Sequence, residues 1–228
     1  FRSEDFIWRM KGDSYMSIME RGGGIINTVR STREASFETL KEKAEWYIEV
    51  MSRMGVTTVE GKSGYGLDKE TELKQLEVMK AINENPSRKV DIATTFLGAH
   101  AVPTEYKGKE DDYIDFLIKE MLPLIQEKKL AEHCDIFCEK GVFTVEQSRR
   151  LLQAAKDKGF GVKIHADEIV SFGGAELAGE LQALSADHLL HASDAGIQAM
   201  ADNHVVATLL PLTAFTLREP YARGREII

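Results

Sequence analysis

A group of polar side chains follows a short apolar run in the second half of the sequence. Residues 161–164 lead directly into His165, Asp167 and Glu168. At the carboxyl end of a barrel strand, these side chains would point into the barrel mouth. A neutral imidazole is a good ligand for zinc or ferrous iron, and a nearby carboxylate can orient or deprotonate a reacting water. The segment therefore predicts a metal-assisted site, and the alternative is a structural histidine that ends the strand.

Two further histidines accompany apolar runs in a similar way. His188 lies in the run at residues 186–190, and His100 follows the run at residues 90–97. His188 could be a metal ligand, a general base or an electrophile for a carbonyl, and the alternative is a buried, hydrogen-bonded histidine. If these runs are strands of one barrel, they bring His100, His165 and His188 close to one rim.

The Gly-Lys-Ser-Gly-Tyr-Gly segment at residues 61–66 follows another apolar run. Its glycines allow the backbone to approach a ligand closely, and Tyr65 would offer a phenolic hydroxyl. Glycine-rich loops are common after strands, so the segment is weak evidence for a phosphate site. His133 and His204 precede apolar runs, which predicts structural or surface roles for them.

Short apolar runs alternate with longer segments in which apolar residues recur every three or four positions. This alternation predicts parallel strands joined by helices, in an α/β fold. No GxGxxG segment follows the first run, and polar chemistry follows several different runs, which favours a (β/α) barrel over a doubly wound sheet. We expect strands at residues 56–59, 90–97, 135–138, 161–164, 186–190 and 205–210, and helices that include residues 37–51, 114–125 and 145–155.

The composition bounds the class of protein. The chain has 228 residues, 43% of them hydrophobic, and a formal net charge of -8. This is enough for a sizeable core, and the acidic balance argues against a nucleic-acid partner. No run is long and apolar enough to span a membrane, and no signal peptide is visible. Cys134 and Cys138 are expected to be small buried hydrophobes in a cytoplasmic protein.

Several segments together resemble the imidazolonepropionase family of the amidohydrolase superfamily, in the same order and with similar spacing. The resemblance covers essentially the whole of residues 1–228. The matching stretches are residues 22–25, 60–67, 96–101, 141–144, 163–168, 185–188 and 221–223.

The resemblance implies a metal-dependent hydrolase with a (β/α)8 TIM barrel, of which this chain supplies about the second to seventh strands. Residues 1–228 would be the central part of one barrel domain, with the first and last strands and a small β domain outside this sequence. The family hydrolyses the cyclic amide of 4-imidazolone-5-propanoate to N-formimino-L-glutamate in histidine degradation. It uses one zinc or iron ion, its substrate is a small molecule, and homodimers are common in it.

The resemblance also implies roles for particular residues. His165 matches the family's metal ligand, Glu168 its proton-handling and substrate-contacting carboxylate, and His188 its active-site histidine. The choice of general base between Glu168 and His188 stays open. The matches to substrate-binding residues are Arg2, Tyr65 and His100.

The sequence departs from the family at several points. The family's metal site also needs an HxH pair and an Asp from the first and last strands, and this sequence has no HxH. Because one protein ligand cannot hold a catalytic ion well, we predict that this stretch alone is inactive or nearly so. Leu212 and Ala214 stand where the family usually has glycine and threonine, which puts the fit of that loop to the substrate in doubt.

Two alternatives compete with this interpretation. The first is another cyclic amidohydrolase of the hydantoinase or dihydroorotase kind, in which a carboxylated lysine follows the fourth strand. Here Glu139 takes the place nearest the site, and Lys140 keeps this alternative open. The second is a non-catalytic fragment or binding module that retains the barrel scaffold without its metal.

Overall fold

Six parallel strands form the centre of the structure, a computed structural model that describes residues 3–13, 17 and 23–228. Each strand pairs with the one that follows it in the sequence. This order is that of a (β/α) barrel, because a doubly wound sheet reverses its strand order. The six expected strands are confirmed, and the fold is a partial TIM barrel. The strands are β1 (Thr58–Lys62), β2 (Asp91–Ala99), β3 (His133–Cys138), β4 (Gly161–Ala166), β5 (Ser185–His188) and β6 (Val206–Thr208).

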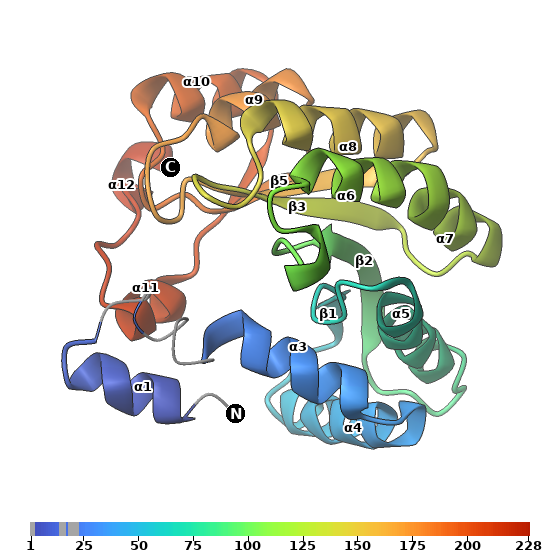
Figure 1. Ribbon diagram of the computed structural model, residues 1–228. Coiled ribbons are helices and arrows are strands. Elements are labelled where there is room, and N and C mark those ends of the chain that lie inside the picture. Colours follow the sequence, from blue (N-terminus) through green and yellow to red (C-terminus); the bar gives the residue numbers. More distant parts are fainter. Residues whose placement is uncertain (1–2, 14–16, 18–22) are drawn as a thin grey trace.

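Helices connect successive strands and cover one side of the sheet. Figure 1 shows α6 to α10 gathered on one side of the strands and α5 beside β1 and β2. The apolar core lies between these helices and the sheet, where Phe96, Ile136 and Leu152 are fully buried. The crossover helices are α5 (Lys69–Asn83), α6 (Glu110–Phe116), α7 (Leu122–Lys128), α8 (Val145–Asp157), α9 (Gly174–Glu180) and α10 (Asp194–Asp202).

Polar side chains determine where several of these helices begin. The hydroxyl of Thr144 accepts from the backbone N–H of Gln147, and Gln147 accepts in return from the Thr144 N–H, which is a capping box before α8. The side chains of Asp68 and Ser193 likewise accept from a backbone N–H in the first turn of α5 and of α10. The loops that carry polar chemistry therefore end at fixed positions.

The helix expected at residues 114–125 is interrupted by a π-helical turn at Leu117–Met121, between α6 and α7. Pro123 lies in the first turn of α7 and has no backbone N–H to donate, so the α-helical pattern cannot continue unchanged across it. The periodic pattern predicted one helix, and the proline explains the break.

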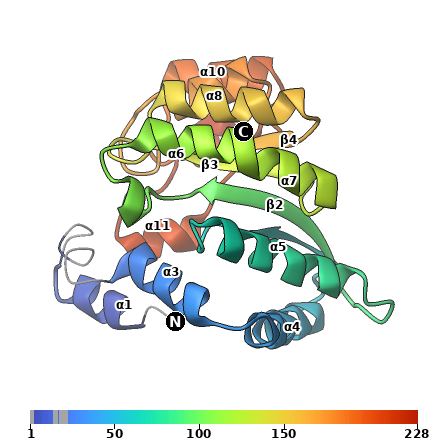
Figure 2. The ribbon, with the colours of Figure 1, turned by 45° about the vertical axis from the view of Figure 1, so that its right-hand side comes forward.

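The remaining helices come from the two ends of the chain. α1 (Ser3–Met10) lies beside α11 (Pro211–Leu217) in both views (Figures 1 and 2), and Arg218 donates to the backbone oxygen of Arg9. The other helices described near the ends are α3 (Gly24–Glu34), α4 (Phe37–Arg53) and α12 (Gly224–Ile227), whereas a 3-10 turn at Thr104–Tyr106 lies between β2 and α6.

Both cysteines are buried free thiols, which confirms that Cys134 and Cys138 are core residues. Burial raises the pKa of both thiols, that of Cys138 to about 11. Of the two histidines expected to be structural or at the surface, His133 is half-buried and His204 is exposed. Among the described residues, none of the helices has the length and apolar character needed to cross a membrane.

Candidate active site

Four aromatic side chains from different strand ends lie next to one another at one rim of the sheet. The ring centroids of Tyr65 and His100 are 5.0 Å apart, those of His100 and His165 5.7 Å, and those of His165 and His188 5.2 Å. Parallel strands end on the same side, so loops after β1, β2, β4 and β5 meet there. The structure therefore brings together the three histidines and the tyrosine singled out from the sequence. Arg2 lies outside the described residues.

Glu168 and His188 form a pair beside His165. His188 Nδ1 lies 3.4 Å from Glu168 Oε1, and both side chains are largely buried. Burial raises the pKa of Glu168 to about 7, against the opposing pull of His165. Burial, together with the charge of His165, lowers the pKa of His188 to about 4. Near neutral pH the pair therefore combines a neutral imidazole with a carboxyl group that can gain or lose a proton.

The loop after β4 is held in place by two buried carboxylates. Asp167 adopts a positive φ of 51°, and Glu139 accepts a hydrogen bond from the backbone N–H of Ile169 at 2.8 Å. Together they fix the backbone on both sides of Glu168. The Asp167 carboxylate accepts from the backbone N–H groups of Phe172, Gly173, Gly174 and Ala175.

His188 itself adopts a positive φ of 76°, which is uncommon for a residue with a side chain. Its neighbour Leu189 has a φ of 58°. Such backbone strain clusters at functional sites, where surrounding contacts hold it in place. The turn at the end of β5 thus places the imidazole of His188 in a conformation that a regular strand would not give.

An ion network beneath the rim was missed by sequence reasoning. Lys62 Nζ lies 2.6 Å from Asp135 Oδ2 and 2.7 Å from Asp187 Oδ2, and His165 Nδ1 lies 3.0 Å from Asp135 Oδ2. Burial would raise the pKa of Asp135, yet His165 and Lys62 hold it well below its usual range. Burial would lower the pKa of His165, but Asp135 outweighs burial and raises it.

This network contains groups that could hold a metal ion. One ligand atom each from Asp135, His165 and Asp187 lies within 4.8 Å of the others. Imidazole nitrogen with carboxylate oxygen is a donor set that suits zinc or iron. Two arrangements fit the chemistry of these residues. Either all three groups bind the ion, or His165 alone of the three binds it and the carboxylates hold the His165 ring in place.

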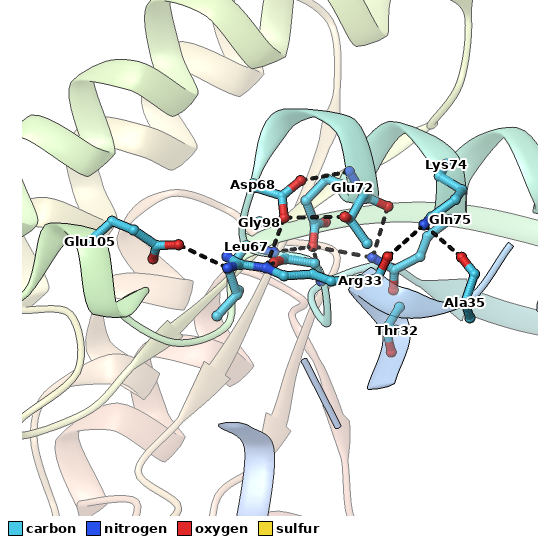
Figure 3. Close-up of polar contacts among 12 residues, drawn as sticks. Thr32, Arg33, Ala35, Leu67, Asp68, Glu72, Lys74, Gln75, Gly98 and Glu105 are labelled. Atoms are coloured by element: carbon cyan, nitrogen blue, oxygen red, sulfur yellow. Dashed lines mark hydrogen bonds and ion pairs between the residues drawn. The ribbon is translucent and has the colours of Figure 1, made fainter. Parts of the chain in front are cut away.

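The loop after β1 is shaped by a buried glutamate in α5. Glu72 is 1% exposed, and its carboxylate accepts from the backbone N–H groups of Gly64, Gly66 and Leu67 at 2.8 to 3.1 Å. Arg33 from α3 donates to the backbone oxygen of Gly66. Its guanidinium group also pairs with Asp68 and Glu105 (Figure 3). Loop residue Tyr65 is thereby presented to the rim.

Gly64 in this loop cannot be replaced without strain. Its φ is +102°, and an added Cβ would lie 2.6 Å from the backbone oxygen of Leu97. His100 Nδ1 contacts the Gly64 oxygen at 3.2 Å, so the loop and the end of β2 are directly joined. The glycine pattern thus serves close backbone packing.

Two residues named as departures from the family differ in their surroundings. Ala214 is fully buried in α11, whereas Leu212 is 74% exposed.

The alternative with a carboxylated lysine can be compared with the structure. Lys140 is exposed, while Glu139 is fully buried. A lysine in the role of a carboxylated metal bridge would have to lie among the buried rim residues, so the structure disfavours this alternative.

The missed residues carried a weak signal in the sequence. Asp135 begins the otherwise apolar run at residues 135–138, and Lys62 and Asp187 lie at strand ends, close in sequence to Tyr65 and His188. A charged residue at an inward position of a buried strand needs a partner. What the sequence could not show is that β1, β3 and β5 bring these three charges together.

Comparisons with known proteins assign relatives to the chain. Imidazolonepropionase of Phocaeicola vulgatus is 79% identical over 228 residues, which are 100% of this chain and 55% of the relative. Imidazolonepropionase of Clostridium tetani is 60% identical, again over 100% of this chain and 54% of the relative. The chain thus spans about half the length of the curated relatives it matches. No family model matches the sequence.

Solved structures share the fold at low identity. An adenine deaminase from Arthrobacter aurescens gives a TM-score of 0.64 at 18% identity, over 90% of this chain and 61% of the other. A guanine deaminase from C. acetobutylicum with bound guanine gives 0.62 at 13% identity, over 88% of this chain and 49% of the other. At these identities the likeness shows the barrel architecture alone.

Proposed function

Since the chain belongs to the imidazolonepropionase family over its full length, we propose that the whole protein opens the cyclic amide of 4-imidazolone-5-propanoate with water. The product is N-formimino-L-glutamate, an intermediate of histidine degradation. The proposal is carried by the joint placement of Glu168 and His188 beside His165, in a chain 79% identical to a relative of that name.

In this proposal His165 is a ligand of one zinc or iron ion. The other ligands that the resemblance implies, an HxH pair and an Asp, lie outside this sequence. When bound, such an ion lowers the pKa of a coordinated water toward neutrality, which makes hydroxide available at working pH. His165 suits this role because it lies at a strand end, beside Glu168 and His188, with an acidic partner behind its ring.

In this proposal Glu168, and not His188, carries the proton. A carboxyl group with a pKa near 7 both accepts and returns a proton efficiently near neutral pH. It would take the proton from the attacking water and deliver it to the departing ring nitrogen. His188, neutral because its pKa is lowered to about 4, would donate a hydrogen bond to the carbonyl oxygen as negative charge develops there.

The remaining rim residues bind the substrate in this proposal. Tyr65 and His100 pack edge to face at 5.0 Å and would contact the imidazolone ring. Arg2 would pair with the propanoate carboxylate, which supplies the cation that an acidic protein needs for an anionic substrate. The homodimer implied by the resemblance and the cytoplasmic location expected from the composition stay predictions, which size-exclusion chromatography and cell fractionation test.

The test is turnover of 4-imidazolone-5-propanoate by the whole protein, with the product identified by mass spectrometry. We expect Glu168→Gln to lower kcat roughly 10²- to 10⁴-fold, the range for a lost general acid–base group. Glu127→Gln, at an exposed position of α7, is the matched control and should leave kcat unchanged. A whole protein that binds a metal ion and leaves this substrate intact would contradict the proposal and favour the non-catalytic binding module.

A further inference from the structure

The charged groups beneath the rim come from alternate strands. Lys62 lies at the end of β1, Asp135 in β3 and Asp187 in β5, and the lysine bridges the two carboxylates at 2.6 and 2.7 Å. Side chains from alternate strands form one layer inside a (β/α) barrel. The three residues are such a layer, and Asp135 within it is fully buried.

Both oxygens of Asp135 are already engaged. Oδ1 accepts from the backbone N–H of Ile136 at 2.7 Å, and Oδ2 accepts from Lys62. His165 Nδ1 lies 3.0 Å from Oδ2 and 3.1 Å from Oδ1. A carboxylate accepts only, so Nδ1 of His165 must carry the proton, and the coordinating lone pair of the neutral ring is on Nε2.

We infer that Asp135, held in place by Lys62, is a positioning residue that fixes the tautomer and ring orientation of His165. The inference rests on the proposed function, in which His165 binds the metal ion through Nε2. A carboxylate behind a histidine ligand is a known way to orient the ring and raise its basicity.

The competing arrangement has Asp135, His165 and Asp187 binding the ion directly. In the structure the ammonium group of Lys62 lies within hydrogen-bond distance of both carboxylates. A metal ion there would have to displace this ammonium group from both carboxylates at once. The existing ion pairs therefore favour Asp135 as the partner of His165.

Two substitutions of the same kind separate these arrangements in the metal-free whole protein. Asp135→Asn and Asp187→Asn each remove one negative charge and one carboxylate contact of Lys62, but only Asp135 bonds the His165 ring. Affinity is measured by competition for Zn²⁺ with a chromophoric chelator, after circular dichroism has shown that each variant is folded. We expect Asp135→Asn to weaken Zn²⁺ binding roughly 10- to 100-fold and Asp187→Asn to bind like the unchanged protein.

Similar losses in the two variants would show that both carboxylates are ligands, and an unchanged affinity in Asp135→Asn would remove the positioning role. If a variant does not fold, a measurement on the unchanged protein tests the same inference. In ¹⁵N-histidine spectra of the Zn²⁺ form, His165 should have a protonated Nδ1 and a metal-bound Nε2, and the reverse assignment would overturn the inference. Because neither measurement uses turnover, a failure of the proposed reaction is seen separately in the imidazolonepropanoate assay.

Discussion

The burial that suits Glu168 to its proposed role as proton carrier also lowers the stability of the fold. Its pKa is raised to about 7 by burial, from an ordinary value of 4.5, so the folded protein favours the protonated form. Between these two pH values the folded state binds more protons than the unfolded state, and stability falls as the pH rises. The loss is complete above pH 7 and amounts to about 3 kcal/mol from the shift in pKa.

We therefore predict that Glu168→Gln stabilises the metal-free whole protein at pH 8 by up to about 3 kcal/mol. The advantage should shrink as the pH falls and vanish near pH 4, where Glu168 is protonated in both states. Urea unfolding at several pH values measures this, with the exposed Glu127→Gln as control. If the stability difference between Glu168→Gln and the unchanged protein does not change with pH, burial does not raise the pKa of Glu168.

We predict that the two cysteines do not react with alkylating reagents in the native protein. Both are buried, and burial raises their pKa values, that of Cys138 to about 11, so little thiolate exists at pH 8. Peptide mapping after treatment with iodoacetamide at pH 8 should find Cys134 and Cys138 unmodified in the native protein and fully modified in urea. Rapid labelling of either in the native state would indicate an opening of β3.

At the scale of elements, the loop after β1 depends on one helix residue. Among the described residues Glu72 forms no ion pair, and its buried carboxylate accepts instead from three backbone N–H groups of the loop and from the side chain of Gln75. We predict that Glu72→Gln lowers stability by about 1 to 3 kcal/mol, because the amide group presents an N–H where an acceptor is needed. It should also raise KM for the proposed substrate, since Tyr65, a proposed substrate contact, loses its fixed position.

The control for this prediction is Glu70→Gln. Glu70 lies in the same first turn of α5 but is exposed, so the helix dipole effect is similar and the loop contacts are absent. Urea unfolding and steady-state kinetics of both variants give the comparison. Equal behaviour of Glu70→Gln and Glu72→Gln would mean that the hydrogen bonds to the loop contribute little.

The strands were predictable from the sequence, and much of the site was not. Short apolar runs indicate all six strands, and the polar residues in or after these runs identify His100, His165 and His188 as candidate site residues. Glu72 looked like one of several acidic residues on a helix, because nothing local shows that it turns inward. Asp135 belongs to an otherwise apolar run, and nothing near it in the sequence shows its partner, because Lys62 is distant in sequence and meets it only in the folded sheet.

At the scale of the whole molecule, the partial barrel leaves two strands with one neighbour each. In the part of the chain that the structure describes, β1 pairs only with β2 and β6 only with β5. Unpaired edges carry free backbone donors and acceptors, which favour pairing with another chain. Val206 adds a 61% exposed apolar side chain to the β6 edge.

We therefore predict that residues 1–228, expressed alone, self-associate at micromolar concentration and do not turn over the proposed substrate. Light scattering with size-exclusion chromatography measures the first, and the imidazolonepropanoate assay the second. Val206→Lys should reduce association, because a lysine on an edge strand opposes pairing. Met10→Lys removes a similarly exposed apolar side chain, 63% exposed, from α1 and should change association little. If the two variants reduce association equally, the association is caused by general surface hydrophobicity and not by the strand edge. A chain of residues 1–228 that is monomeric and active would show that β1 to β6 form a sufficient catalytic unit.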